Sequence, residues 1–225
     1  MQLTALEKAS RRLSIMMLAI GWLAFPVLAS ADVTNGAFTD GNTGFSTAYT
    51  YAAADLFTVG GHYSVDSDPS HFNPTAKSFG DHTTGQGQML LTDGSPVAGA
   101  QVWGQTMTGV PHTQYTFSYY SASWGTNGAG GITDQSPATL LATANGLQVG
   151  STLQLLASDG VWSHFSGTFD SGSQSTIILE IQDLNTTFQG NDFAIDDISV
   201  LPAPEPAPVW MISLIPAALL RRRAR

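Results

Sequence analysis

The sequence contains no cysteine among its 225 residues. Without thiols the chain cannot form a disulfide, use a cysteine nucleophile, or hold zinc or an iron–sulfur cluster through thiolate ligands. A folded domain of this chain must therefore be stabilised by the packing of its core, or by an ion that oxygen ligands bind.

Basic residues are also scarce. Seven of the eight Lys and Arg residues lie near the two ends of the chain, and only Lys77 lies between residues 32 and 206. The same interval holds 16 of the 17 acidic residues, which gives it a formal charge of −15. Nucleic-acid binding needs Lys and Arg to neutralise phosphates, so we expect no nucleic-acid partner. The excess of carboxylates favours solubility and provides many oxygen ligands for a cation.

The first 31 residues have the three parts of a secretory signal peptide. The start carries three basic side chains, Lys8, Arg11 and Arg12. Residues 13–28 are apolar and uncharged, and a cleavage site follows with small residues at Ala29 and Ala31. Because the apolar run is short for a membrane span, we expect this segment to be cleaved rather than retained. The mature chain is therefore predicted to be exported and to begin at Asp32.

The last 25 residues also have three parts. Pro204-Glu205-Pro206 is followed by an apolar run over residues 207–220 and then by a basic end that contains Arg221, Arg222, Arg223 and Arg225. A bilayer core needs about 20 apolar residues to be spanned, and this shorter run is interrupted by Pro216. We expect a short hydrophobic helix that holds a membrane weakly, with the arginines on the cytoplasmic side.

This order of features resembles the PEP-CTERM sorting tail of Gram-negative bacteria. The resemblance implies that residues 201–225 form a sorting tail, and that the export machinery and an exosortase-type processing enzyme are partners. It also implies a location at the cell surface or outside the cell, a transient membrane contact through the tail alone, and a role alongside exopolysaccharide. The residues that would carry the sorting signal are Pro204, Glu205, Pro206, Arg221, Arg222 and Arg223.

Between the two end segments no long amphipathic helical period is found, and several stretches alternate between apolar and polar residues instead. Tyr115, Phe117 and Tyr119, for example, alternate with Thr116 and Ser118. The pattern predicts strands over residues 161–165, 167–169, 175–183 and 193–200, and further strands near 47–51, 88–92, 101–107, 140–143 and 152–157. Turn signals separate them at Asp93-Gly94, Asn145-Gly146 and Asp159-Gly160. Many short strands of this kind predict an antiparallel sandwich or barrel.

The same interval carries motifs in a recognisable order. It begins with Asn35-Gly36-Ala37-Phe38 and ends with the Asn-Asp-Phe-Ala-Ile-Asp-Asp-Ile segment of residues 191–198. Between them lie Asp81-His82-Thr83-Thr84-Gly85, Asp93-Gly94, Val102-Trp103-Gly104-Gln105-Thr106, Tyr115-Thr116-Phe117-Ser118 and Trp162-Ser163-His164-Phe165. This order resembles the galactose-binding-like jelly rolls of secreted bacterial proteins, which include many carbohydrate-binding modules. The resemblance implies one all-β domain over residues 32–200, an antiparallel jelly-roll β-sandwich, and it does not fix a ligand.

Two neighbouring carboxylates, Asp196 and Asp197, lie within the apolar closing segment. Because neighbours in a strand point to opposite faces, one of the two is expected to face inward or toward an edge. A buried carboxylate needs a partner or a cation. In the resembling modules the closing-strand aspartate often helps to bind a structural calcium ion, which implies Asp196 as a ligand, joined by Asp40 or by backbone oxygens near Phe38. The alternative is a carboxylate that caps local backbone amides and needs no ion.

Tryptophan and tyrosine residues provide candidates for sugar binding, since exposed aromatic faces bind the C–H faces of pyranose rings. Trp103 and Trp162 stand in strand patterns and are expected in the core. Trp124 precedes the Gly-rich stretch 125–131 and is expected to be exposed, and Tyr120 lies opposite the presumed core face. The candidate carbohydrate-binding residues are therefore Trp124 and Tyr120.

Catalytic motifs are not found. The five histidines are scattered, no Gly-x-Ser-x-Gly elbow is present, and the Gly-rich stretch 125–131 lacks the lysine of a phosphate loop. Between residues 32 and 206 the only glutamates are Glu180 in a strand and Glu205 in the tail. We therefore predict a non-enzymatic exported protein of the cell surface or extracellular matrix. The alternative is a carbohydrate-binding module with a sugar site near Trp124.

Overall fold

The computed structural model describes residues 33–54, 59–125, 136–187 and 189–204. The predicted signal peptide (residues 1–31), most of the predicted sorting tail (205–225) and most of the Gly-rich stretch lie outside the described residues. Within the described ranges no helix is long and apolar enough to cross a membrane.

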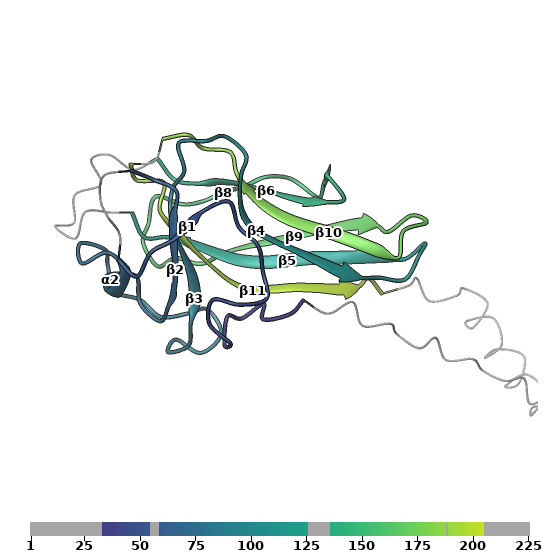
Figure 1. The fold of residues 1–225 in the computed structure, drawn as a ribbon, viewed down its shortest axis with the longest axis horizontal. Helices are drawn as coiled ribbons and strands as arrows, with labels where there is room; N and C mark the ends of the chain where they lie inside the picture. Colours follow the sequence, from purple (N-terminus) through teal and green to yellow (C-terminus); the bar gives the residue numbers. More distant parts are fainter. Residues whose placement is uncertain (1–32, 55–58, 126–135, 188, 205–225) are drawn as a thin grey trace, which may run out of the picture.

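Two β-sheets pack face to face and make up nearly all of the described chain (Figure 1). The six-stranded sheet has, in spatial order, β1 (Thr50–Tyr51), β2 (His62–Asp66), β3 (Met89–Asp93), β11 (Phe193–Pro202), β5 (Gln114–Ser123) and β9 (Ser163–Asp170). The five-stranded sheet has β4 (Ala100–Thr108), β10 (Thr176–Asp183), β6 (Thr139–Ala144) and β7 (Leu147–Gln148), with β8 (Leu153–Gln154) also paired to β6. Apart from the short parallel pair of β1 and β2, the named strand pairs are antiparallel. The predicted all-β, jelly-roll β-sandwich is confirmed.

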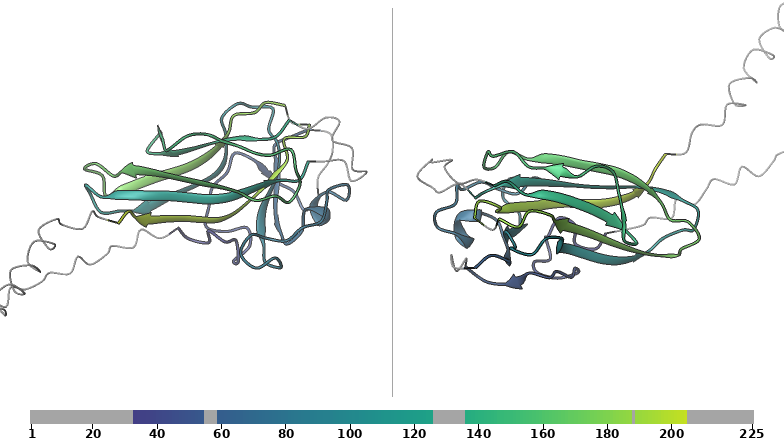
Figure 2. Two further views of the ribbon diagram at one scale, coloured as in Figure 1. Left: turned by 180° about the vertical axis from the view of Figure 1, so that it is seen from behind. Right: turned by 90° about the horizontal axis from the view of Figure 1, so that it is seen from above.

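The long strands run along the long axis of the domain, as the views from behind and from above show (Figure 2). The segments predicted at residues 175–183 and 193–200 become β10 and β11. The segment predicted at 152–157 yields only the two residues of β8, and β2 was not predicted. Asn145 and Gly146 form the expected tight turn between β6 and β7, where both residues have positive φ angles of 51° and 76°.

The core lies between the two sheets, and alternate residues along the strands point into it. On β5, Tyr115, Phe117 and Tyr119 are fully buried and face the other sheet. Trp103 on β4 meets them from the opposite side, with its ring centroid 6.3 Å from that of Phe117, so the expectation of a core Trp103 is confirmed. Burying each of these side chains stabilises the sandwich by about 1.5–3 kcal/mol relative to exposure.

A second hydrophobic cluster lies on the outer face of the six-stranded sheet and consists of Phe72, Met89, Leu91, Trp124 and Ala194. It is covered by the segment between β2 and β3, which carries the short helix α2 (Pro69–Phe72). Asp68 caps this helix by accepting a hydrogen bond from the Ser70 amide. The segment closes one part of an otherwise open sheet face.

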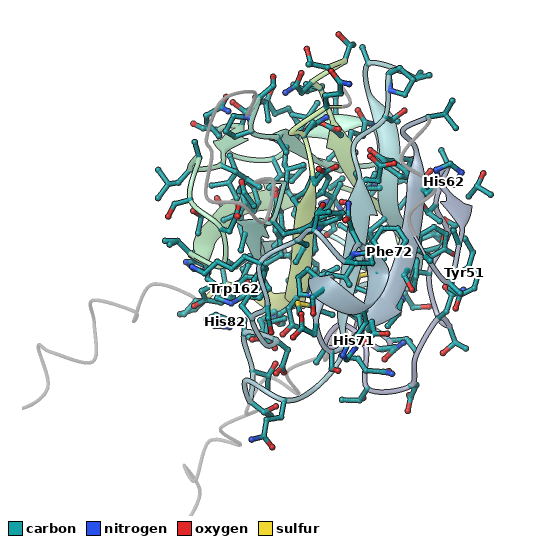
Figure 3. All side chains as sticks on the ribbon, turned by 90° about the vertical axis from the view of Figure 1, so that its left-hand side faces the viewer. Tyr51, His62, His71, Phe72, His82 and Trp162 are labelled. Carbon is teal, nitrogen blue, oxygen red and sulfur yellow. The ribbon has the colours of Figure 1, made fainter. Side chains whose placement is uncertain are left out.

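Trp124 belongs to this covered part, which corrects the expectation that it is exposed. Its relative exposure is 1%, and its ring lies edge-on against Phe72 with centroids 5.8 Å apart. The alternation of side-chain direction along β5 puts Trp124 on the outer face, together with Tyr120 and Ala122. The part of that face around Trp124 is covered by α2, whose Phe72 is labelled in Figure 3. A tryptophan in this position is a packing residue and offers no ring face to a ligand.

Closure of the domain depends on an irregularity in β11. The register of β11 against β5 shifts between Asp196 and Ser199, and Asp197 has a positive φ of 52°. The amide of Ile198 donates to the carbonyl of Gly36 at 2.9 Å, and a Cβ at Gly36 would lie 2.0 Å from the Ile198 oxygen. Only glycine therefore allows the first described turn to approach the bulge this closely.

Candidate functional site

The candidate site lies on the open part of the outer face of the six-stranded sheet, over β11, β5 and β9. Tyr120 on the central strand β5 is directly opposite Asp196 on one side and His164 on the other. The ring of His164 stacks on Tyr120 with centroids 4.5 Å apart. His82 lies in the loop between α2 and β3. Its ring stacks on that of Tyr120, with centroids 3.5 Å apart and an interplanar angle of 14°. Since the two imidazoles reach Tyr120 from opposite sides of β5, they cover both faces of its ring.

Two further rings extend this arrangement. Trp162, just before β9, meets His82 edge-on at 5.6 Å, and Phe79 meets Trp162 edge-on at 5.9 Å. Figure 3 shows Trp162 and His82 next to each other at one side of the molecule. We call the five side chains Phe79, Trp162, His82, Tyr120 and His164 the ring row. Trp162 was expected in the core, and the structure instead places it half-buried on the outer face, next to the second cluster.

The two closing-strand aspartates hold the loop that carries His82. Asp196 Oδ2 accepts hydrogen bonds from the backbone amides of His82 and Thr83, at 3.0 and 3.2 Å, and from the Thr83 hydroxyl. Asp197 Oδ2 lies 2.7 Å from His82 Nδ1, and its Oδ1 accepts a short hydrogen bond from the same Thr83 hydroxyl. One of the two aspartates was expected to face inward or toward an edge. The bulge instead brings both to the same loop.

The implied calcium ligands fit the structure only in part. Burial raises the pKa of Asp196 to about 6, and its Oδ1 is a buried oxygen without a hydrogen-bond partner, which a cation would satisfy. Its Oδ2 caps backbone amides, as the ion-free alternative expected. Asp40 is exposed, and its amide donates to Asn35 Oδ1. The residues that the structure describes contain no group of three or more His, Asp and Glu side chains able to hold a metal ion.

Beyond the ring row, the open face carries small hydroxyl side chains in two cross-strand rows. Ser118 on β5 lies between Ser199 on β11 and Ser166 on β9, and Thr116 on β5 is opposite Thr168 on β9. Their outward direction follows from the burial of the alternating residues of β5. Within the described chain none of these five hydroxyls has a hydrogen-bond partner. We call Thr116, Ser118, Ser166, Thr168 and Ser199 the hydroxyl field. Sequence reasoning missed it, because strand register is needed to place the five side chains side by side.

Positive charge is nearly absent from this region. Lys77 is the only Lys or Arg among the described residues, and its Nζ donates to the carbonyl of Asp159 at 3.3 Å. His82 is paired with Asp197, as noted above. An anionic ligand would therefore find almost no countercharge here at neutral pH.

A second group of buried polar side chains lies at the end of the sandwich and was also not predicted. Asp183, at the end of β10, is fully buried and accepts hydrogen bonds from Tyr49 Oη at 3.3 Å, Asn191 Nδ2 at 2.7 Å and the Asn185 amide at 3.0 Å. Burial raises the pKa of Asp183 to about 6, because its hydrogen bonds only partly offset the loss of hydration. This group ties the loop before β11 to the five-stranded sheet.

Comparison with protein-family models gives no match, and comparison with curated proteins gives none either. Solved structures with a similar fold include the CBM22-1–CBM22-2 tandem domain of Xyn10C from Paenibacillus barcinonensis, with a TM-score of 0.50 and 17% identity over 83% of this chain. This chain spans 48% of that tandem. The CBM22-1 xylan-binding domain of the same protein gives a TM-score of 0.48 and 18% identity over 80% of this chain and 99% of that one.

A Stig cyclase from Fischerella sp. TAU, solved in complex with an indole compound, gives a TM-score of 0.55 and 14% identity over 79% of this chain and 98% of that one. At such identities the similarity shows the fold alone. The same architecture thus occurs in carbohydrate-binding modules and in enzymes.

Protonation of Asp183 makes the stability of the domain depend on pH. The folded-state pKa of about 6 lies above the ordinary value of 3.8, so between about pH 4 and 6 the folded state binds more protons than the unfolded state. The free energy of unfolding therefore falls as pH rises through this window, by about 1–3 kcal/mol for this group, and then levels off. Urea unfolding of the mature domain at a series of pH values measures this fall.

Asp183→Asn should reduce the fall, while Asp196, whose pKa is also raised to about 6, continues to contribute in the same direction. Asp170→Asn, at an exposed aspartate, is the matched control for the loss of a carboxylate. Equal pH dependence in the wild type and in Asp183→Asn would show that Asp183 is ionised without penalty in the folded state.

Proposed function

We propose that this protein is a non-enzymatic carbohydrate-binding domain whose site is the ring row and the adjoining face of β5 and β9. The observation that carries the proposal is the row of partly exposed rings around Tyr120 next to hydroxyls that have no partner in the described chain. Sugars present both apolar C–H faces and hydroxyl groups, so they bind where aromatic surface and free hydrogen-bonding groups lie side by side.

The individual side chains have different roles in this proposal. Since both faces of Tyr120 are covered by imidazoles, it offers its rim and its hydroxyl to a ligand, while the exposed His164 offers the outer face of its ring. His82 is fixed by Asp197, which leaves its Nε2 as the nitrogen available to a ligand. Trp162 packs edge-on against the ring of His82. The predicted sugar site therefore keeps Tyr120 and gives up Trp124.

Occurrence of the same fold in a tandem of carbohydrate-binding modules supports a binding role. Occurrence in cyclases means that the fold alone does not decide between binding and catalysis. We favour binding because both carboxylates next to the ring row, Asp196 and Asp197, are engaged in holding the loop at His82 and Thr83. The remaining oxygen of Asp196, Oδ1, is buried away from solvent. A general acid or base must instead reach the reacting atoms of a ligand.

Substitution of the ring row tests the site. Tyr120→Ala and His164→Ala should each weaken binding to a soluble neutral polysaccharide such as xylan, hydroxyethylcellulose or β-1,3-glucan by about tenfold or more, equivalent to about 1.4 kcal/mol. The loss follows from removal of ring surface and of a polar tip. Affinity gel electrophoresis of the mature domain through gels that contain each polysaccharide measures the change.

Tyr51→Ala is the matched control, because Tyr51 is a 52% exposed tyrosine at the far edge of the same sheet. Figure 3 shows it on the side of the molecule opposite Trp162 and His82. Retained binding in Tyr51→Ala together with lost binding in Tyr120→Ala supports the site. Equal retardation of the wild type and both site variants in every gel would refute it.

A structural calcium ion at Asp196 remains part of the proposal. The unpartnered Asp196 Oδ1 supports it, with oxygens from the first turn of the domain, including Asp40, as further ligands. Calcium at millimolar concentration should then raise the melting temperature of the EDTA-treated domain, since an ion that binds only the folded state stabilises it. Magnesium at the same concentration and the Asp196→Asn variant serve as controls. Identical melting curves with calcium and with EDTA would exclude the ion.

Export and sorting complete the proposal, supported by the sequence pattern of residues 1–31 and 201–225. In this scheme the signal peptide is removed after Ala31, and the exosortase-type enzyme processes the tail near Pro204-Glu205-Pro206. The domain then remains at the cell surface or in the extracellular matrix, where exopolysaccharide is the glycan within reach of its site.

Processing has a direct readout in the mass of the mature protein. We expect a mass that corresponds to a start at Asp32 and an end close to Glu205, measured by intact mass spectrometry on protein from the culture medium and from the cell envelope. A Glu205→Ala variant should accumulate with its tail in the membrane fraction. A mature protein that still ends at Arg225 would refute the processing step.

A further inference from the structure

The hydroxyl field is the strongest feature of the open face that the ring row does not explain. Five short hydroxyls lie side by side on this face, between the ring row and the exposed Gln114, Asp170 and Leu201 at the far ends of the three strands. They continue from the ring row along the strands toward the end of β11, because Thr116 is opposite Leu201 and Tyr115 is opposite Pro202. That end of the domain lies opposite α2 (Figure 1).

Strand geometry gives the dimensions of this face. From Tyr120 to Thr116 along β5 is four residues, or about 14 Å, and the three strands β11, β5 and β9 span about 10 Å across. A single pyranose ring on the ring row would leave the hydroxyl field untouched. A ligand that uses the whole face must therefore contain several linked sugar units.

The chemistry of the face also selects the ligand. Hydroxyls of Ser and Thr both donate and accept, which matches sugar hydroxyls. Lys77 is the only Lys or Arg among the described residues and donates to the Asp159 carbonyl, while Asp197 pairs with His82 in the ring row. A polymer of uronic acids or sulfated sugars would bring repeated negative charges to a face without countercharge.

We infer that the ring row and the hydroxyl field form one extended site for an uncharged polysaccharide chain. The chain runs along β5 and β9, from the ring row at Tyr120 to the threonine pair Thr116 and Thr168. This inference rests on the proposed sugar-binding function and adds to it the length, the charge and the direction of the ligand. The rings bind one sugar unit, and the hydroxyls bind the units that follow.

Chain length is the first test. Isothermal titration calorimetry at pH 8 compares the disaccharides and hexasaccharides of xylan and of cellulose, with polygalacturonate as the acidic polymer. For the neutral series that binds, the hexasaccharide should bind at least about tenfold more tightly than the disaccharide, and polygalacturonate should not bind. Equal affinity for short and long chains, or binding of polygalacturonate, would overturn the inference.

The double variant Ser118→Ala with Ser166→Ala is the second test. It should weaken hexasaccharide binding several-fold and leave disaccharide binding unchanged. Ser173→Ala with Ser175→Ala, at exposed serines in the turn between β9 and β10, is the matched control and should change neither. Because the hydroxyls of Ser118 and Ser166 have no partner within the described chain, their removal should leave the melting temperature unaltered.

The two levels of the proposal fail in different ways. If Tyr120→Ala abolishes binding while the Ser118 and Ser166 variant binds the hexasaccharide like the wild type, the extended site is wrong and the sugar site at the ring row stands. If the wild type binds none of the neutral oligosaccharides and polysaccharides, both are wrong.

Discussion

The bulge at Asp196 and Asp197 is the constraint on which the rest of the site depends. In a regular strand these neighbours would point to opposite faces, and only one of them would reach the loop above the sheet. The register shift and the positive φ of Asp197 bring both carboxylates within hydrogen-bonding distance of the Thr83 hydroxyl. A positive φ is strained for a side chain other than glycine, so the structure accepts a local cost of about 1–3 kcal/mol in return for these bonds.

The position of His82 is a consequence of this bulge. With its backbone amide held by Asp196 and its Nδ1 by Asp197, the imidazole lies over β5, where it stacks on Tyr120. The buried Asp196 needs these donors in turn, because without them its desolvated carboxylate would be left unsatisfied on both oxygens. The same hydrogen-bond group thus contributes both to the stability of the closing strand and to the geometry of the site.

Alternation of apolar and polar residues was enough to predict the sandwich, because a period of two fixes which residues face the core. It correctly predicted that Tyr115, Phe117 and Tyr119 face the core, and that Tyr120 lies on the opposite face of the same strand. It could not predict which part of the outer face is covered. That depends on the segment around α2, four helical residues with no sequence period, and so Trp124 was placed wrongly. The contact between His82 and Tyr120 depends on the fold as a whole, and no spacing in the sequence encodes it.

The outer face of the six-stranded sheet has a covered part and an open part, and the side chains that each strand supplies decide which part is which. Over β3 and the ends of β11 and β5 the outward residues are Met89, Leu91, Ala194 and Trp124, which need cover from water and receive it from Phe72. Over β9 and the middle of β5 they are Ser, Thr, His and Tyr, which need none and stay open. The five hydroxyls of this second part have no hydrogen-bond partner within the described chain, so they hold no other part of the domain in place. The composition of this part is then best accounted for by what it contacts outside the molecule.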